Sequence, residues 1–346
     1  MTVNAAPSPP FIVIAENIHA TRVVLRGGQR VVALPDGRPA LPFIDDAGAD
    51  RLLHVPDAAL DGPAGPQQRV KHVKAAVLAG LGPDPAAAEL GRGYVRALAR
   101  RQSRAGAHYL DLNVDEVTTD QEGRVAAMRW VVEAVEDATD ARLAIDSSSS
   151  AVLRAGLVAC ARRARPSLLN SAALDRLDVL DLAAAEGVPV VLSASGAGRM
   201  PANTEERVAN ASALIEAATT RGIGLDDLFV DALVLPVAVD PEVGRHFLDA
   251  VSALRGAFGP ALHLTGGLSN VSFGLPLRKL INDVFIELAA SAGADSGIID
   301  PVANDPRRVF GQDHAAVSYR LAADLLTGAD EYGGEFLRAF RAGALG

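Results

Sequence analysis

Short apolar segments alternate with longer segments of helical periodicity along most of the chain, and this alternation constrains the fold more than any other feature. Within the short apolar segments, polar residues rarely alternate with apolar ones. This is expected for strands in a sheet that is covered on both faces. Because parallel neighbours need a crossover helix, the pattern predicts a parallel sheet. The predicted strands are Phe11–Asn17, His108–Val114, Leu143–Ser147, Ser167–Ser171, Pro189–Ala194, Leu228–Leu233, Leu262–Asn270 and Gly297–Asp300.

Eight strand–helix units in 346 residues favour an α/β fold of the closed (β/α)8 type, a TIM barrel, over an open doubly wound sheet. No Gly-x-Gly-x-x-Gly motif follows the first strand, which also disfavours a dinucleotide-binding fold. We expect residues 1–346 to form a single barrel domain. The helices are predicted at Pro85–Arg104, Asp120–Ala138, Ser149–Arg163, Leu177–Glu186, Thr204–Arg221, Pro241–Phe258, Leu277–Ala292 and His314–Leu326.

Two segments depart from this alternation. Residues 23–68 interrupt the first unit, and Val31–Leu34 followed by Pro35-Asp36-Gly37 predicts a β-hairpin, with a Pro/Gly-rich loop after it. An insertion after strand one is expected at the C-terminal face of the barrel, where it is either a lid or a decorative or oligomer-forming addition. Residues 329–346 are predicted to form a tail helix whose apolar stripe serves core or subunit contacts.

Composition excludes several classes of function. The net charge is −9 and no basic run occurs, so nucleic acid is not an expected partner. No apolar run reaches the length of a membrane span, and Met1–Pro10 lacks the features of a secretory signal. The single cysteine, Cys160, fits a reducing compartment, so we expect a cytoplasmic protein. The scattered histidines lack metal-ligand spacing, and no metal site is predicted.

Polar residues stand where the predicted strands end, which in a barrel is the catalytic face. Asp, Asn and Ser also cap helices, but Asp111 and Asp231 lie too far ahead of their next helix for that use. No lysine occupies a strand end, which argues against Schiff-base chemistry, and Thr265-Gly266-Gly267 is only a weak trace of a phosphate loop. The strand-end set is Glu16-Asn17, Asp111-Leu112-Asn113, Asp146-Ser147, Asn170-Ser171, Asp231, Ser269-Asn270 and Asp300.

Carboxylates and amides suit a ligand whose edge is rich in hydrogen-bond donors. A pterin is such a ligand, because its 2-amino group and N3–H form a donor pair that one carboxylate can accept side by side. Residue types alone do not select a pterin over another heterocycle.

The strand-end segments resemble those of the pterin-binding methyltransferases, meaning the methyltetrahydrofolate–corrinoid protein methyltransferases and the folate domain of cobalamin-dependent methionine synthase. Dihydropteroate synthase is a more distant relative. The resemblance covers nearly the whole chain except the insertion, the extreme N-terminus and the tail. It rests on Ile14–Ile18 with Thr21-Arg22, Leu110–Val114, Ile145–Ser147, Leu169–Ser171, Val230-Asp231 with Leu235-Pro236, and Gly267–Phe273.

The resemblance implies a role for each matching residue. Asp146, Asn170 and Asp231 would hold the pterin ring, Ser269 would also contact the pterin, and Asn270 would approach N5, the nitrogen that carries the methyl group. Supporting roles would fall to Glu16, Asp111 and Asn113. Arg278, which opens the helix after strand seven, is either a solvated surface residue or the partner of an anionic group such as the glutamate tail of folate. One departure is His19, which stands where the family commonly has an amide.

By resemblance, the activity is methyl transfer between tetrahydrofolate or 5-methyltetrahydrofolate and a corrinoid, in a direction that the sequence leaves open. We expect the corrinoid on a partner protein, because no second domain is evident, and we expect a homodimer. A dihydropteroate synthase-like enzyme is one alternative, although Ile299-Asp300-Pro301 lacks the basic element that those enzymes carry on the last strand. A non-catalytic folate-binding protein on the same barrel is another.

Overall fold

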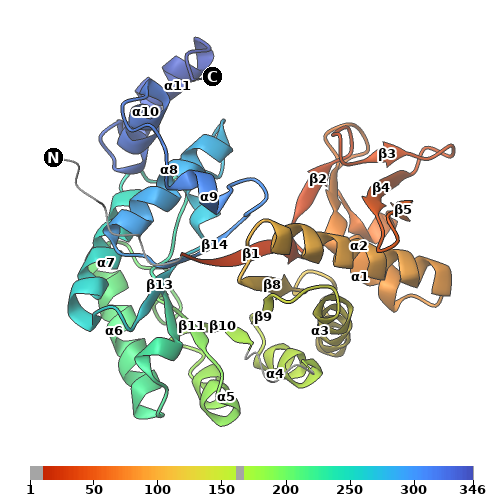
Figure 1. Cartoon of the computed structure of the whole chain (residues 1–346), viewed down its shortest axis with the longest axis horizontal. Coiled ribbons are helices and arrows are strands. Elements are labelled where there is room, and N and C mark those ends of the chain that lie inside the picture. Colours follow the sequence, from red (N-terminus) through yellow and green to blue (C-terminus); the bar gives the residue numbers. More distant parts are fainter. Residues whose placement is uncertain (1–10, 161–166, 346) are drawn as a thin grey trace. The chain divides into compact units, whose positions relative to one another are not determined.

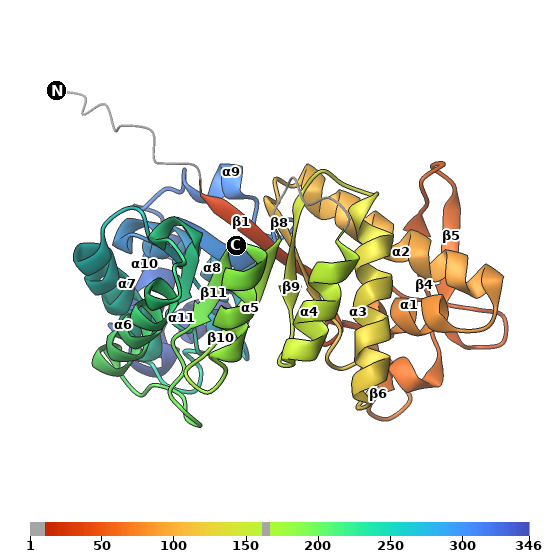
Figure 2. The ribbon, with the colours of Figure 1, turned by 90° about the horizontal axis from the view of Figure 1, so that it is seen from below.

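The computed structural model describes residues 11–160 and 167–345. The chain divides into two compact units, one formed by residues 1–14 and 171–346 and the other by residues 15–170. The boundaries fall within two strands of one eight-stranded sheet, so each unit contains part of that sheet together with its helices (Figures 1 and 2).

The eight-stranded sheet has the order β13-β12-β11-β10-β9-β8-β1-β14, and a parallel bridge between Gly267 and Ile298 links the region after β13 to β14. This arrangement confirms the predicted (β/α)8 barrel. Each strand core is almost entirely buried, which explains the continuous apolar runs in the sequence. The strands are β1 (Ile12–His19), β8 (Tyr109–Asn113), β9 (Arg142–Asp146), β10 (Leu168–Ala172), β11 (Val190–Ser193), β12 (Leu228–Asp231), β13 (His263–Thr265) and β14 (Ser296–Ile299).

Each predicted helix is present, with bounds that shift by a few residues, and the last part of the helix predicted to end at Arg163 lies outside the described residues. The helix α1 (His72–Leu81) was not predicted. No helix in the described ranges combines the length and apolar character that crossing a bilayer requires. The other helices are α2 (Pro85–Arg104), α3 (Gln121–Glu136), α4 (Ser150–Ala159), α5 (Asp178–Glu186), α6 (Thr204–Thr220), α7 (Val243–Phe258), α8 (Arg278–Ala292), α9 (Pro306–Val309), α10 (Val317–Leu326) and α11 (Gly334–Arg341).

One strand prediction was wrong in a way that matters for the site. The seventh strand ends at Thr265, so Ser269 and Asn270 lie in the 3-10 turn η3 (Leu268–Ser272) rather than on the strand. The chain leaves the strand at Gly266-Gly267, where Gly266 is so close to Phe247 that a Cβ atom would come within 2.8 Å of that ring. Without β-branched residues at these two positions, little favours continued strand structure.

The insertion forms two small antiparallel sheets. One has the order β2 (Val23–Leu25), β7 (Arg69–Lys71), β6 (Leu60–Asp61), and the other β3 (Val32–Ala33), β4 (Pro39–Ile44), β5 (Asp50–His54). The turn at Pro35-Asp36-Gly37 joins β3 to β4, where the sequence predicts a hairpin. The stretch expected to be a Pro/Gly-rich loop instead contains β5 and β6, because Gly48 (φ +81°) allows a second tight turn.

Candidate functional site

Four of the predicted site residues form one cluster in the unit of residues 15–170. Asn113, Asp146 and Asn170 are register neighbours at the ends of the parallel strands β8, β9 and β10. The Asn113 amide donates to Asp146 Oδ2 at 3.0 Å, and the Asn170 amide donates to Asp111 Oδ1 at 3.2 Å. Asp111 is 2% exposed. The strand ends therefore carry a connected cluster of two carboxyl groups and two amides.

Asp111 is a buried carboxyl group whose pKa is shifted by its neighbours in this cluster. Its pKa is raised well above the usual value, mainly because burial removes water from the charged form, and further because Asp146 is close, while the Asn170 hydrogen bond opposes the shift. Two adjacent carboxylates cannot both remain charged at low cost in a buried site. These effects favour the protonated form of Asp111, which can share a hydrogen bond with Asp146.

His19 contacts the carboxylate of Asp146, which the sequence analysis did not predict. Its Nδ1 accepts the backbone N–H of Thr21 at 3.2 Å and lies 2.7 Å from the Thr21 hydroxyl. Because a backbone N–H can only donate, a neutral His19 ring carries its proton on Nε2. That nitrogen lies 3.5 Å from Asp146 Oδ2. The departure from the family's usual amide thus places a ring N–H donor beside Asp146.

Glu16 is paired with Arg22, which follows it closely in the chain. Arg22 forms an ion pair with the Glu16 carboxylate and donates from Nε to the Glu16 carbonyl at 3.3 Å. Glu16 also adds to the negative field that raises the pKa of Asp111. This geometry is compatible with the predicted supporting role rather than with direct ligand contact.

The other unit holds Asp231 at the end of β12. Asp231 Oδ1 accepts the backbone N–H of Leu233 at 2.8 Å, and Leu233 adopts a left-handed conformation (φ +67°). Burial raises the pKa of Asp231 to about 6, although the Leu233 hydrogen bond and the charge of Arg207 act in the opposite direction. Asp231 is therefore a carboxylate at neutral pH that protonates in mildly acidic solution.

Arg207 is a second residue that the sequence analysis missed. It is fully buried on α6, where its Nη1 donates to the carbonyl oxygens of Asn203 and Pro201. Its Nε and Nη2 have no hydrogen-bond partner among the described residues. An arginine in the apolar stripe shared with Ala211 and Leu214 is the signal that could have identified it, since charged residues are rarely fully buried without a partner.

Asn270 lies in the η3 turn, with its side chain folded close to Gly267. A Cβ atom at position 267 would come within 2.7 Å of the Asn270 amide nitrogen, so this placement depends on glycine. Ser269 is 5% exposed, and its hydroxyl has no partner in the part of the chain that the structure describes.

Arg278, the first residue of α8, forms hydrogen bonds to the η3 turn. It donates to the Ser269 carbonyl at 2.9 Å and to the Ser272 hydroxyl at 3.0 Å, and its guanidinium lies 4.4 Å from the centre of the Phe273 ring. The Arg278 side chain therefore binds the turn that contains Asn270. The predicted role toward an anionic group stays a prediction.

Comparison with known proteins connects these strand ends to a family. The chain is 29% identical over 259 residues to a methylcorrinoid:tetrahydrofolate methyltransferase of Eubacterium limosum, which covers 73% of this chain and 89% of that protein. It is 31% identical over 219 residues to the methionine synthase of Mycobacterium leprae, covering 58% of this chain but only 17% of that much longer protein.

Among solved structures, a dihydropteroate synthase from Stenotrophomonas maltophilia superposes with a TM-score of 0.51 at 20% sequence identity, covering 63% of this chain and 86% of that one. This likeness supports the barrel fold. Residues 93–300, more than half of the chain, match the family described as pterin binding enzyme. The matched range contains the ends of β8, β9, β10 and β12 together with the η3 turn. The chain therefore belongs to the pterin-binding enzyme family.

Proposed function

We propose that this protein transfers a methyl group between N5 of 5-methyltetrahydrofolate and the cobalt of a corrinoid held by a separate protein. The observation that carries the proposal is the match over 89% of the length of a methylcorrinoid:tetrahydrofolate methyltransferase. The carboxylates and amides at the strand ends support it, together with Asn270 in the η3 turn.

The pterin ring fits this set of donors and acceptors. Asp146 and Asp231 supply carboxylate oxygens for ring N–H and amino donors, and charge assistance strengthens such hydrogen bonds. Asn170 supplies an amide. The raised pKa of Asp111 favours its protonated form, which would donate to Asp146 without adding a second negative charge. His19 adds a further donor at Asp146.

Asn270 is the residue that we assign to the reacting nitrogen. Breaking the N5–methyl bond is slow because the departing nitrogen carries its electron pair away, and a hydrogen bond to that nitrogen lowers the barrier. An amide cannot supply the proton itself, but it can rotate to present either its oxygen or its N–H₂ group. Asn270 would therefore stabilise N5 electrostatically as its charge changes in the transition state.

The corrinoid supplies the cobalt that accepts or donates the methyl group, while the barrel orients the folate. The same residues serve both directions, since the forward and reverse reactions pass through one transition state. A synthase function is weaker, because the likeness to dihydropteroate synthase supports the fold alone.

An assay with free corrinoid tests the proposal in both directions. The purified chain is mixed with 5-methyltetrahydrofolate and cob(I)alamin, or with tetrahydrofolate and methylcob(III)alamin, and transfer is followed by corrinoid absorbance. We expect turnover in at least one direction. Folate binding without transfer in either direction, measured with free corrinoid and with corrinoid proteins, would instead identify a non-catalytic folate-binding protein.

A further inference from the structure

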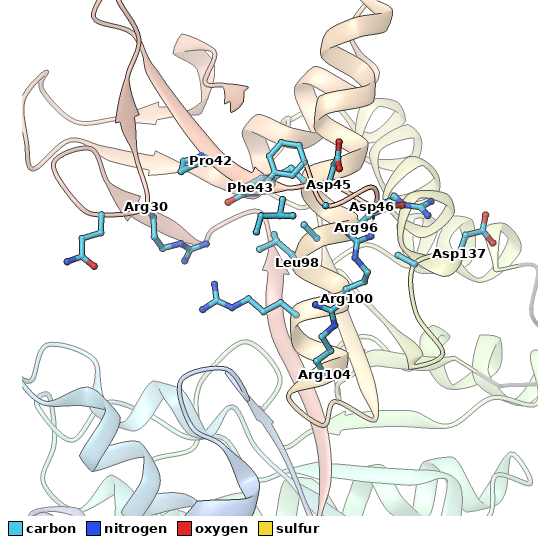
Figure 3. Close-up of a pocket in the computed structure, with 17 residues that line it drawn as sticks. Arg30, Pro42, Phe43, Asp45, Asp46, Arg96, Leu98, Arg100, Arg104 and Asp137 are labelled. Atoms are coloured by element: carbon cyan, nitrogen blue, oxygen red, sulfur yellow. Dashed lines mark hydrogen bonds and ion pairs between the residues drawn. The ribbon is translucent and has the colours of Figure 1, made fainter. Parts of the chain in front are cut away.

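A cavity separate from the strand-end residues lies within the unit of residues 15–170, between the insertion and α2 (Figure 3). Its volume is about 840 Å³. The insertion contributes Arg30 and Phe43, and α2 contributes a row of arginines. Such a volume is typical of sites for small organic molecules rather than of contacts with another protein.

Five guanidinium groups and three carboxyl groups line this cavity, in a chain whose net charge is −9. Arg96, Arg100 and Arg104 follow one another at four-residue spacing on α2, so they project from one side of that helix. Arg101 and Arg30 complete the set. Arg101 and Arg104 lie in the last turn of α2, where positive charge also complements the helix dipole, but Arg30, Arg96 and Arg100 do not.

The carboxyl groups neutralise only part of this charge. Asp46, at the tip of the β4–β5 hairpin, pairs with Arg96 at 2.7 Å and also with Arg100. Asp45 pairs with Arg51, which does not line the cavity. The hairpin is thereby fixed on α2, and two of the arginines are used in fixing it.

Three arginines remain without an ion pair to any carboxylate of the described chain, namely Arg30, Arg101 and Arg104. Arg30 interacts with the Tyr94 hydroxyl, which also hydrogen-bonds to His72 at 3.1 Å. Burial lowers the pKa of His72 to about 3, so that histidine adds no charge.

Apolar side chains form the rest of the lining. Phe43 packs edge-on against Tyr94, with ring centres 5.6 Å apart, and Pro42, Ile44 and Leu98 lie beside them. Figure 3 shows Phe43 and Leu98 near the middle of the cavity with Arg30 and Arg100 around them. A ligand for this cavity would combine negative charge with an apolar or flat portion.

The α2 and α3 residues of the cavity lie near the starts of β8 and β9 rather than near the ends that carry Asp146 and Asn113. Arg104 is the last residue of α2 and precedes the start of β8, whereas Asn113 is the last residue of that strand. Asp137, which also lines the cavity, follows α3 and precedes the start of β9. A ligand bound here would therefore occupy a different place from a pterin at the carboxyl ends of the strands.

From this arrangement we propose that the cavity binds a small phosphate-bearing anion. Guanidinium groups form paired hydrogen bonds with phosphate oxygens, and a phosphate offers more charge and more acceptor oxygens than a carboxylate. Three unneutralised arginines around one cavity match such a group, and the Phe43 side of the cavity can hold a flat ring. The chemistry is shared by nucleotides and by inorganic polyphosphate.

Calorimetric titration of the full chain with ATP and with inorganic pyrophosphate tests this proposal. We expect both to bind, with an affinity that falls as salt is raised. Tighter binding of ATP identifies a nucleotide as the source of the phosphate, and equal binding identifies inorganic phosphates. Absence of binding of both at millimolar concentration, or tighter binding of triglutamate than of either, overturns the proposal.

Two variants locate the binding. Loss of both free guanidinium groups in Arg101→Ala/Arg104→Ala should weaken ATP and pyrophosphate binding by about 100-fold, since each charge-assisted hydrogen bond contributes about tenfold. Arg129→Ala removes an exposed arginine from α3 outside the cavity and should change affinity less than about twofold. Unchanged affinity in the double variant, with an unchanged thermal melt, overturns the assignment to this cavity.

Discussion

The two groups of candidate residues differ in how far their polar atoms are satisfied. In the unit of residues 15–170, Asp111, Asn113, Asp146 and Asn170 bond to one another, and His19 adds a contact to Asp146. In the other unit, buried Arg207 and Ser269 keep polar atoms without a partner among the described residues. Buried polar atoms normally find partners, so unsatisfied ones indicate places where a ligand or water completes the structure.

The same contrast applies to the two buried carboxyl groups. Asp111 lies beside another acid, and its raised pKa favours the protonated form, which is a hydrogen-bond donor. Asp231 lies within the field of Arg207, and its pKa of about 6 leaves it charged at neutral pH. Burial raises the pKa of both groups; at Asp111 the neighbouring acid adds to the shift, whereas at Asp231 the Leu233 hydrogen bond and then the charge of Arg207 oppose it. The first group is therefore internally hydrogen-bonded, whereas the second holds a carboxyl group with a pKa of about 6 and an asparagine in a 3-10 turn.

The largest effect is expected at Asn270, and it separates catalysis from binding. An interaction that strengthens only in the transition state contributes to rate more than to affinity. Asn270→Ala should lower the single-turnover rate of methyl transfer by about 10²–10³-fold, as for loss of one preorganised polar group. Folate affinity should fall only severalfold. Stopped-flow transfer beside equilibrium binding checks this.

Gly267→Ala offers a matched test of the same residue, because the new Cβ atom would displace the Asn270 amide without removing it. We expect it to lower the rate in the same direction as Asn270→Ala, by a smaller factor. Rate and affinity that fall together in Asn270→Ala would make Asn270 a binding residue. If neither changes, the turn does not face N5.

Asp146→Ala and Asp231→Ala should weaken folate binding directly, one in each group. Each removes charge-assisted hydrogen bonds that contribute roughly 1.5–3 kcal/mol, which corresponds to about 10- to 150-fold in affinity. Titration calorimetry with 5-methyltetrahydrofolate measures both. Wild-type affinity in the two variants would remove the pterin assignment altogether, while a loss in only one of them would show which group holds the ring.

The pH dependence of folate binding distinguishes the two carboxyl groups. Because the pKa of Asp231 is about 6, affinity should stay constant above that pH and fall about tenfold per pH unit below it, as the charged acceptor is lost. The raised pKa also means that the folded state holds this proton more tightly than the unfolded chain. The free energy of unfolding from this group should therefore decrease as pH rises from about 4 to 6.

Asp231→Asn should abolish both trends. Binding is measured by calorimetry and unfolding by urea titration at each pH. An affinity that stays level between pH 5 and 7.5 in the wild-type protein would mean that Asp231 does not accept hydrogen bonds from the ligand.

The barrel and the strand-end residues could be predicted because both follow from the order of residue types along the chain. Apolar runs followed by Asp or Asn repeat along the chain, and parallel strands bring their carboxyl ends to one face. Sequence patterns did not predict the burial of Arg207 or the contact between His19 and Asp146. Both depend on which residues distant in the sequence pack together in the folded chain. The η3 turn was misjudged because a strand and a glycine-led turn share the same apolar residues around Leu268.

The smallest effect on folate affinity is expected for Asp111→Asn. Asparagine has the shape of a protonated aspartic acid, with an oxygen that can accept from Asn170 and an N–H₂ group that can donate to Asp146. Asp111→Asn should therefore change folate affinity by less than about threefold and the free energy of unfolding by less than about 1 kcal/mol. Asp111→Ala leaves Asn170 and Asp146 without that partner and should cost about 1–3 kcal/mol of unfolding free energy. Urea unfolding and calorimetry on both variants provide the measurement. If Asp111→Asn weakens binding as strongly as Asp146→Ala, then Asp111 is the charged member of the pair and the two acids exchange roles.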